Sequence, residues 1–381
     1  MIYLDHQAST PMHPDSIAAM QASLVEHIAN PHSSDHAFGW AAEDAVDDAR
    51  QALAEAIGVH SDEICFTSGA TEADNIALLG TLGQAPRQDR IVVSAIEHKA
   101  VIGPAREACR QEGELLIAPC DANGVVELEQ LTEMVDARTR LVSVMLVNNE
   151  IGTVQPIARI ADICRSAGVI LHVDAAQALG WMPIDAFELG ADIMSFSAHK
   201  MGGPKGIGAL FVRREVRNFV RPLFFGGEQE DGLRPGTLPV PLCTAFGAAC
   251  RALPGVLEVE GWRQRTLDFE RELTSRLPGT FVNGASAQRH PGSTSLTLPG
   301  RNADAILSRL QPAVAVSRGS ACTSGIAEPS HVLRALGLSS SDCASTIRIS
   351  SGRNTSQEEL DEALERIVVA AQAVGCVGEA A

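Results

Sequence analysis

The chain has 381 residues, of which 45% are hydrophobic and 20% charged, proportions that exclude a disordered or fibrous protein. Thirty Lys and Arg against 47 Asp and Glu give a net charge of −17, which argues against direct binding to nucleic acid or anionic lipid. The apolar stretches are shorter than the roughly 20 residues of a membrane helix, and Met1–Ser9 lacks the pattern of a signal peptide. Nine cysteines occur without C-x-x-C spacing, so we expect free thiols in a reducing cytoplasm.

Strand and helix patterns alternate along most of the chain. A long amphipathic helix with an acidic face is predicted first, at Trp40–Ile57. Short apolar runs then predict strands at Ile64–Thr67, Ile91–Ser94, Glu114–Ala118, Leu141–Val147, Val169–Val173, Asp192–Ser197 and Ile207–Val212. Helical patterns lie between several of them, at Glu72–Gly80, Leu128–Val135 and Ile157–Ser166. Apolar strands separated by helices indicate an α/β fold with a mainly parallel sheet covered by helices on both faces.

The pattern changes in the last third of the chain. Gly261–Leu277 is a second long helical stretch, the elements after Phe281 are shorter, and a helix near Gln357–Val374 closes the chain. We therefore predict a large domain at 13–257. A smaller α+β domain would combine 1–12 with 258–381.

Ligands of open parallel sheets bind at the carboxyl ends of the strands, so polar residues at those ends are the candidates for chemistry. Lys200 follows the strand Asp192–Ser197 with His199 beside it, and a glycine-rich turn comes next. Most lysines are merely exposed. Between His199 and a glycine-rich turn, however, the position suits a Schiff-base lysine beside a bound phosphate.

A pyridoxal phosphate site needs more than a lysine. Asp174 ends a predicted strand, where its carboxylate could hold the pyridine nitrogen, and Gln177 could donate to the phenolic oxygen. The segment Thr67–Glu72 is a strand end, a glycine turn and a helix start, so its N–H groups and the Thr71 hydroxyl could bind an anion. Each feature alone could be a helix cap. Together they favour pyridoxal phosphate, and no dinucleotide or P-loop motif competes.

Three further features complete the candidate set. Cys322 lies among glycines and hydroxyl residues, unlike the other cysteines, which indicates an exposed nucleophile or sulfur carrier. His98 and Asn149 each follow a predicted strand, and a histidine there could shuttle protons. His32 and His36 have i, i+4 spacing but no third ligand, so we expect no metal site.

In order, these motifs resemble the cysteine desulfurases of the class V aminotransferase group, within fold type I of pyridoxal phosphate enzymes. The matching stretches run nearly from end to end: Tyr3–Pro11, Asn30–His36, Thr67–Asn75, Glu97–Val101, Val147–Gly152, His172–Gln177, Ser195–Lys200, Arg234–Thr237, Gly319–Cys322 and Ile347–Arg348. The segment from Cys322 to Leu333 resembles the iron–sulfur-supply branch rather than the selenocysteine-lyase-like branch.

The resemblance implies a role for each matching position. Lys200 would bind the cofactor covalently, His98 would stack on its ring and transfer protons, and Cys322 would attack the substrate sulfur. The remaining cofactor contacts would be Asp174, Gln177, Ala70, Thr71, Ser197, His199 and, in the partner subunit of a homodimer, Thr237. The carboxylate of L-cysteine would bind to Asn149, Arg348 and Asn30.

The implied reaction gives alanine and a persulfide on Cys322, which passes to a sulfur-acceptor protein, with iron–sulfur cluster assembly as the default. Sulfur supply for tRNA, DNA or thio-cofactors by the same chemistry is an alternative, as is a class V aminotransferase or lyase without sulfur transfer. A thiol near pKa 8.5 is only a few per cent ionised at about pH 7, so we expect a proton acceptor, with His98 as the candidate. Gln7 and Glu228 depart from the family pattern at the rim of the site.

Overall fold

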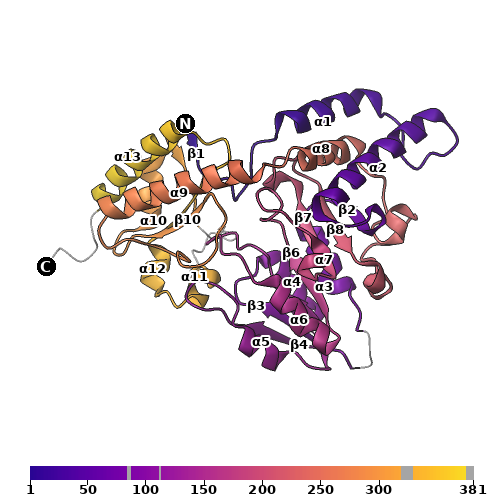
Figure 1. Ribbon diagram of the computed structural model, residues 1–381, viewed down its shortest axis with the longest axis horizontal. Helices are drawn as coiled ribbons and strands as arrows, with labels where there is room; N and C mark the ends of the chain where they lie inside the picture. The colour runs from indigo at the N-terminus through magenta and orange to yellow at the C-terminus, as the bar shows by residue number, and fades with distance from the viewer. Residues whose placement is uncertain (84–86, 111–112, 319–328, 375–381) are drawn as a thin grey trace.

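The computed structural model describes residues 1–83, 87–110, 113–318 and 329–374. Figure 1 shows two parts side by side, one built on a large sheet and one formed by both ends of the chain. The helices of the larger part are α1 Pro14–Glu26, α2 Ala37–Ile57, α3 Ala70–Gly80, α4 Lys99–Ala108, α5 Leu128–Met134, α6 Ile157–Ala167, α7 Ala186–Leu189 and α8 Val240–Arg251. Its strands are β2 Ile64–Thr67, β3 Arg90–Ser94, β4 Glu114–Ala118, β5 Thr139–Ser143, β6 Ile170–Asp174, β7 Ile193–Ser197 and β8 Gly208–Val212.

These strands form one seven-stranded sheet in the order β2-β8-β7-β6-β5-β3-β4. Neighbours from β7 through β4 pair in parallel, and only β8 runs the other way, antiparallel to both β7 and β2. The strand β2 therefore points in the same direction as the other parallel strands. As a result, the ends of β2, β3, β5, β6 and β7 reach the same edge of the sheet.

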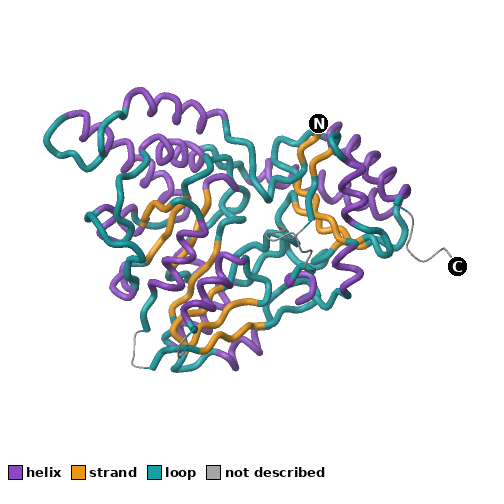
Figure 2. The backbone as a smooth tube through the Cα atoms, turned by 180° about the vertical axis from the view of Figure 1, so that it is seen from behind, coloured by secondary structure: helices purple, strands orange, loops and turns teal. Residues whose placement is uncertain are grey.

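Alternate residues of the strands enter two different apolar clusters, one on each face of the sheet. On β2, Phe66 packs in the cluster that contains residues of α2, α5, α6 and α8, whereas Cys65 packs in the cluster with α3 and α4. This alternation follows from the two-residue period of a strand. Helices cover both faces, which confirms the predicted layering (Figure 2).

The smaller part has its own apolar core. It contains β1 Ile2–Tyr3, the C-terminal half of α9 Val256–Arg276, and the elements β9 Phe281–Val282, β10 Ser293–Thr297, α10 Ala303–Leu310, β11 Val314–Ala315, β12 Thr346–Ser350 and α13 Gln357–Ala373. Strand β1 pairs with β11, and β10 lies between β9 and β12. Short helices α11 His331–Ala335 and α12 Ser340–Ala344 precede β12.

Helix α9 joins the two cores. Val259 and Trp262 near its start pack in the large cluster, whereas Phe269 and Leu273 pack in the small one. A boundary at 258 therefore falls in the first turn of a continuous helix. We keep the division into 13–257 and 1–12 with 258–381 as a proposal, in which this helix is the rigid connection.

Some elements differ from their predicted bounds. The run Leu141–Val147 was expected to be a single strand, but β5 ends at Ser143. Beyond it, the amides of Val144 and Leu146 still bond to carbonyls of His172 and Asp174, without a regular ladder. Apolar composition alone does not show where a buried run stops being a strand.

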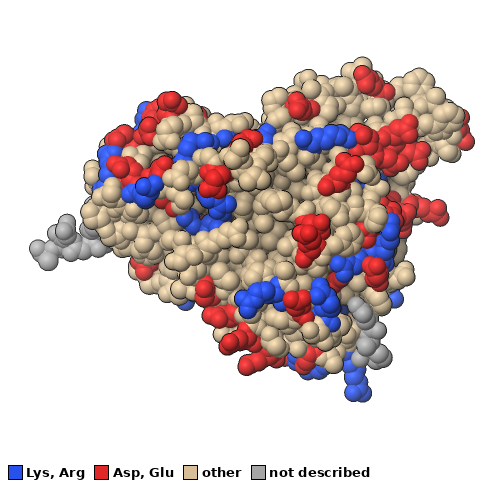
Figure 3. All heavy atoms as spheres, viewed as in Figure 1, with Lys and Arg blue, Asp and Glu red and all other residues tan. Residues whose placement is uncertain are grey.

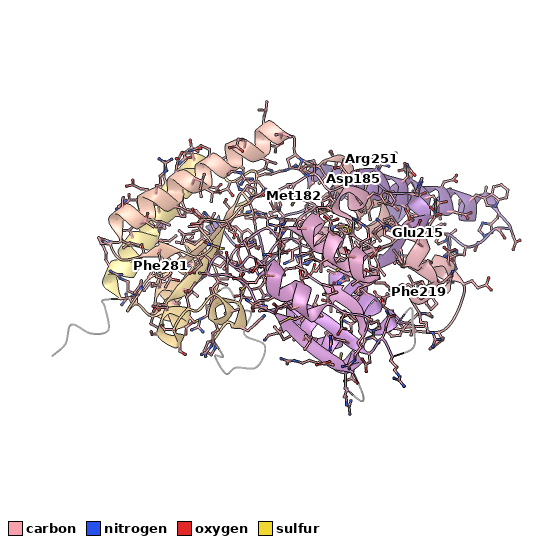
Figure 4. The ribbon with its side chains drawn as sticks, turned by 60° about the horizontal axis from the view of Figure 1, so that its bottom comes forward. Met182, Asp185, Glu215, Phe219, Arg251 and Phe281 are labelled. Atoms are coloured by element: carbon pink, nitrogen blue, oxygen red, sulfur yellow. The ribbon has the colours of Figure 1, made fainter. Side chains whose placement is uncertain are left out.

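The charged surface agrees with the composition. The acidic residues Glu43, Asp44, Asp47 and Asp48 of α2 are exposed, and Figure 3 shows Asp and Glu gathered over that end of the molecule. Figure 4 shows Phe281 in the smaller part, far from Glu215 and Phe219 in the larger one.

Within the described residues, no single helix has the length and apolarity to cross a membrane. Only α8 and α9 taken together, bent by 84°, meet those criteria by length and composition.

Candidate active site

A cavity of about 870 Å³ lies where the carboxyl ends of the parallel strands meet the smaller part. Both parts contribute to its wall. Ten of the predicted site residues line it, namely Lys200, His98, Asp174, Gln177, Ala70, Thr71, Ser197, His199, Asn149 and Arg348. The structure thus gathers in one place residues that are up to 278 positions apart, from Ala70 to Arg348.

One wall of the cavity is the junction of β2 and α3. Gly69 precedes α3 with φ 153°, and a side chain there would meet no atom within 4 Å on its open side. The first N–H groups of a helix lack intrahelical partners and carry partial positive charge, so the amides of Ala70 and Thr71 can bind an anion. Glu72 is occupied elsewhere, because it accepts from the Ser68 amide and bonds to Arg234.

Lys200 stands just beyond β7, in the short turn 198–200. Its Nζ donates to the carbonyl oxygens of Gln7, at 2.5 Å, and Ala8, at 2.9 Å. Burial and the positive charge of Arg348 lower the pKa of Lys200 to about 8. A lysine with this pKa has a sizeable neutral fraction near neutrality, which an amine nucleophile requires.

Asp174 is the last residue of β6 and is buried. One carboxylate oxygen accepts from the Ala176 amide at 2.9 Å, and burial raises the pKa of Asp174. Gln177, one turn further on, donates from Nε2 to the Gln7 carbonyl at 2.8 Å. That carbonyl therefore accepts from both Lys200 and Gln177, so the N-terminal arm orders two of the predicted cofactor contacts.

Two histidines face the cavity from the larger part. His98 is the N-cap of α4, and its Nδ1 accepts the Ala100 amide at 3.1 Å. Enclosure by the cavity walls lowers the pKa of His98, and the nearby Lys200 and Lys99 lower it further. Burial lowers the pKa of His199 to about 4, so this ring is neutral at physiological pH. Ser197, at the end of β7, completes this side.

On the opposite wall of the cavity, the smaller part contributes the positively charged side chain of Arg348. Arg348 lies on β12 and is buried; it donates to the Asn149 carbonyl at 2.8 Å and to Asp5 at 2.7 Å. Ser317 also donates to Asp5. Within the described residues, Nε of Arg348 has no hydrogen-bond partner. A guanidinium held in a fixed orientation at the cavity wall is suited to a substrate carboxylate.

Three predicted residues do not join this group. Thr237 and Asn30 are exposed and lie outside the cavity wall. The Asn30 side chain instead accepts from the His32 amide. Cys322 lies outside the described residues. Of the described residues that flank it in the sequence, Ser317, Arg318 and His331 line the cavity wall.

The cavity also contains residues to which the sequence analysis gave no role. Asp74 and Glu97 are fully buried. Within the described chain, both carboxylate oxygens of Asp74 and one of Glu97 lack a hydrogen-bond partner, and His172 Nε2 lies 3.6 Å from Asp74 Oδ1. Nε2 of Gln7 likewise has no hydrogen-bond partner among the described residues, whereas its Oε1 accepts from Ser293. Asp74 and Glu97 lie within quoted motifs, which was the available signal, whereas the position of Gln7 depends on how the N-terminal arm packs.

Comparison with known proteins agrees with this geometry. The family model for class V aminotransferases matches residues 2–363. A cysteine desulfurase IscS of Rickettsia felis is 42% identical over 374 residues, covering 96% of this chain and 90% of the relative. A cysteine desulfurase of Mus musculus is 41% identical over 370 residues, covering 96% of this chain and 80% of the relative. The chain belongs to the cysteine desulfurase family of class V aminotransferases.

Solved structures of the family have the same fold. A NifS-like protein superposes with a TM-score of 0.86 at 32% identity, covering 97% of this chain and 98% of that one. SspA in complex with cysteine superposes with a TM-score of 0.81 at 33% identity, covering 92% and 98%. The predicted family and the predicted α/β fold are therefore confirmed.

Within the described residues, no three His, Cys, Asp or Glu side chains are grouped so that they could hold a metal ion.

Proposed function

We propose that this cysteine desulfurase uses pyridoxal 5′-phosphate to remove sulfur from L-cysteine, giving L-alanine and a persulfide on Cys322. The observation that carries the proposal is the convergence of Lys200, Asp174 and the α3 N-terminus on one cavity with Arg348 opposite. An amine nucleophile, an acid, an anion site and a carboxylate site are the groups that such a reaction requires.

The residues present fit the cofactor. Unpartnered N–H groups at Ala70 and Thr71, with Ser197 and His199 nearby, would hold the phosphate. Asp174 would pair with the ring nitrogen, and this pairing would supply the positive partner that its buried carboxylate lacks. Gln177 would bind the phenolic oxygen and Lys200 the carbonyl carbon. When bound, the cofactor supplies an electron sink that allows the C–S bond to break.

The chain's own groups then orient the substrate. Arg348 would bind the L-cysteine carboxylate together with Asn149, whose carbonyl already fixes the guanidinium. His98 would stack on the ring. Because its Nδ1 accepts the Ala100 amide, neutral His98 carries its proton on Nε2 and would act in proton transfer through that atom.

The acceptor and the assembly are parts of the same proposal. In a homodimer, Thr237 of one subunit would reach the active site of the other, and Asn30 would do the same. Both residues are exposed. Large apolar side chains are also exposed on and after α1, among them Leu24, Val25 and Ile28. The IscS name of the relatives supports iron–sulfur cluster assembly as the destination of the sulfur. Seven described cysteines are free, which fits a cytoplasmic location.

The test is release of alanine and sulfide from L-cysteine with a thiol reductant present, for wild type and Cys322→Ser side by side. Wild type should release both in equal amounts, and the variant almost none while still binding the cofactor. Equal release by both proteins would contradict the role of Cys322. Cofactor binding without alanine release from wild type would favour another reaction of the fold.

A further inference from the structure

A third imidazole lines the cavity, in addition to those of His98 and His199. His331 is the first residue of α11, three positions after the segment that contains Cys322. Its Nε2 reaches the carbonyl oxygen of Glu97, the residue before His98, and the preceding residue, Ser330, donates to Glu150. The ring is half-buried, and like His98 it is part of the cavity wall.

Each ring is held by one hydrogen bond to the backbone: His98 accepts from an amide, and His331 donates to a carbonyl oxygen. The Ala100 amide donates to Nδ1 of His98, so that nitrogen uses its lone pair and the neutral ring carries its proton on Nε2. His331 Nε2 lies 2.9 Å from the Glu97 carbonyl oxygen, which can only accept. His331 Nε2 therefore carries the proton, and Nδ1 keeps its lone pair.

No hydrogen bond within the described residues occupies Nδ1 of His331. His98 in its neutral form has a proton to give but no free lone pair, whereas His331 has a free lone pair. One ring thus offers a proton donor and the other a proton acceptor, and acid–base chemistry uses both. The anchor of His331 is the carbonyl of the residue before His98, so the two rings share one support.

We propose that His331 is a catalytic proton acceptor in sulfur transfer. This inference rests on the proposed function. As the acceptor thiolate attacks the substrate sulfur, Nδ1 of His331 takes the thiol proton: the S–H bond breaks, an N–H bond forms, and the S–H electron pair stays on sulfur. The transferred sulfur becomes an anionic persulfide. The electron pair of the broken C–S bond stays on the three-carbon fragment, which takes up one proton and becomes alanine.

Ionisable groups lie around His331. Ser330, the residue before it and the N-cap of α11, donates to the Glu150 carboxyl. His98 and Lys99, at the start of α4, directly follow Glu97, whose carbonyl holds the His331 ring. Burial raises the pKa of Glu150, while the His331 and Lys99 charges act in the opposite direction.

The experiment compares His331→Gln with His331→Ala in the cofactor-loaded enzyme. The Gln amide can still donate to the Glu97 carbonyl but has no basic nitrogen, so it separates positioning from proton acceptance. His60→Gln is the matched control, since His60 is exposed and lies away from the cavity. The measured quantities are kcat and KM for alanine release, the pH profile of kcat, and the affinity for L-cysteine from the cofactor absorbance.

In both His331 variants kcat should fall about 100-fold or more, the size of a lost general base. KM, L-cysteine affinity and cofactor content should stay within about threefold of wild type. The pH profile of kcat should change shape in both. Full activity in His331→Gln, or a pH profile of kcat in it identical to that of wild type, would overturn the assignment. Wild type that releases no alanine would overturn the proposed function, and this role with it.

Discussion

Lys200 lies where its ammonium charge is unfavourable. The side chain is largely enclosed and close to Arg348, and the two backbone carbonyls that it contacts replace only part of its hydration. Its pKa is therefore about 8 instead of 10.5. Neutral amine forms at lower pH than for an exposed lysine, which prepares this group for attack on a carbonyl.

The first prediction concerns the pH dependence of cofactor capture. The neutral amine reacts, so the rate at which apoenzyme captures pyridoxal phosphate should rise about tenfold per pH unit below pH 8 and level off above it. Stopped-flow absorbance measures this rate. Lys200→Ala should show no capture that borohydride can make permanent. A rate that continues to rise to pH 10 would contradict the depressed pKa.

The second prediction concerns Arg348. Arg348→Ala should raise KM for L-cysteine about 10- to 100-fold, because a charge-assisted contact is worth about 1.5–3 kcal/mol. Arg348→Lys keeps the charge but lacks the planar guanidinium, so its KM should lie between those of wild type and Arg348→Ala. Steady-state alanine release gives KM, and cofactor absorbance controls for folding. An unchanged KM in the alanine variant would place the carboxylate site elsewhere.

Residue identities at strand ends could be predicted, because parallel strands bring their carboxyl ends to one edge and only a few residue types can hold a phosphate or a ring nitrogen. The carboxylate oxygens of Asp74 and Glu97 that lack a hydrogen-bond partner within the described residues could not be predicted in the same way. Their significance depends on complete burial, which the pattern of apolar residues does not reveal for a polar side chain.

At the scale of elements, the loop before α8 is held by ionic contacts to α2 and α3 and by a hydrogen bond to β2. Glu230 pairs with Arg50 at 2.7 Å and accepts from the Phe66 amide at 2.6 Å. Arg234 bonds to Glu72 at 3.0 Å. Glu230 and Asp231 both adopt positive φ, 52° and 53°, which the surrounding contacts must enforce. This loop carries Thr237.

The third prediction follows from the buried pair. Glu230→Ala removes the buried carboxylate that pairs with Arg50 and should lower the free energy of unfolding by about 3–5 kcal/mol, although Arg50 keeps a 3.8 Å contact to Asp47. The exposed Glu228→Ala is the control and should change it by less than about 0.5 kcal/mol. Urea unfolding followed by circular dichroism measures both. If the two variants were equally stable, the Arg50 contact would not anchor the loop.

Most elements were predictable because their apolar periodicity is regular, and the main exception shows the limit of that signal. The run after Ser143 remains buried and apolar, but Asn148 closes a tight turn there by accepting the amides of Glu150 and Ile151. A turn formed by one side chain inside an apolar context is not marked by periodicity.

At the scale of the whole molecule, the cavity exists because two cores meet. The larger part supplies Lys200, Asp174 and His98, and the smaller part supplies Arg348 and His331. Helix α9 fixes one core relative to the other, and the N-terminal arm crosses between them with Gln7 beneath Lys200. Such long-range packing could not be predicted from local patterns, although the pairing of the two chain ends was expected.

The fourth prediction concerns assembly. Sedimentation velocity should show a homodimer, because exposed apolar side chains extend from α1 into α2, among them Val25, Ile28 and Phe38. Ile28→Asp combined with Phe38→Asp should give a monomer with weakened cofactor affinity, since Thr237 would no longer reach a partner's site. The exposed Phe281→Asp in the smaller part is the control and should remain dimeric. A monomeric wild type would contradict the assembly.

The most direct test of the central claim is the location of sulfur after one turnover. Cofactor-loaded enzyme is mixed with L-cysteine in the absence of reductant, quenched with an alkylating agent, digested, and analysed by peptide mass spectrometry. The account predicts one added sulfur atom on the peptide that contains Cys322, with one alanine released per sulfur bound. Alanine release with the extra sulfur on another cysteine, or on none, would contradict it.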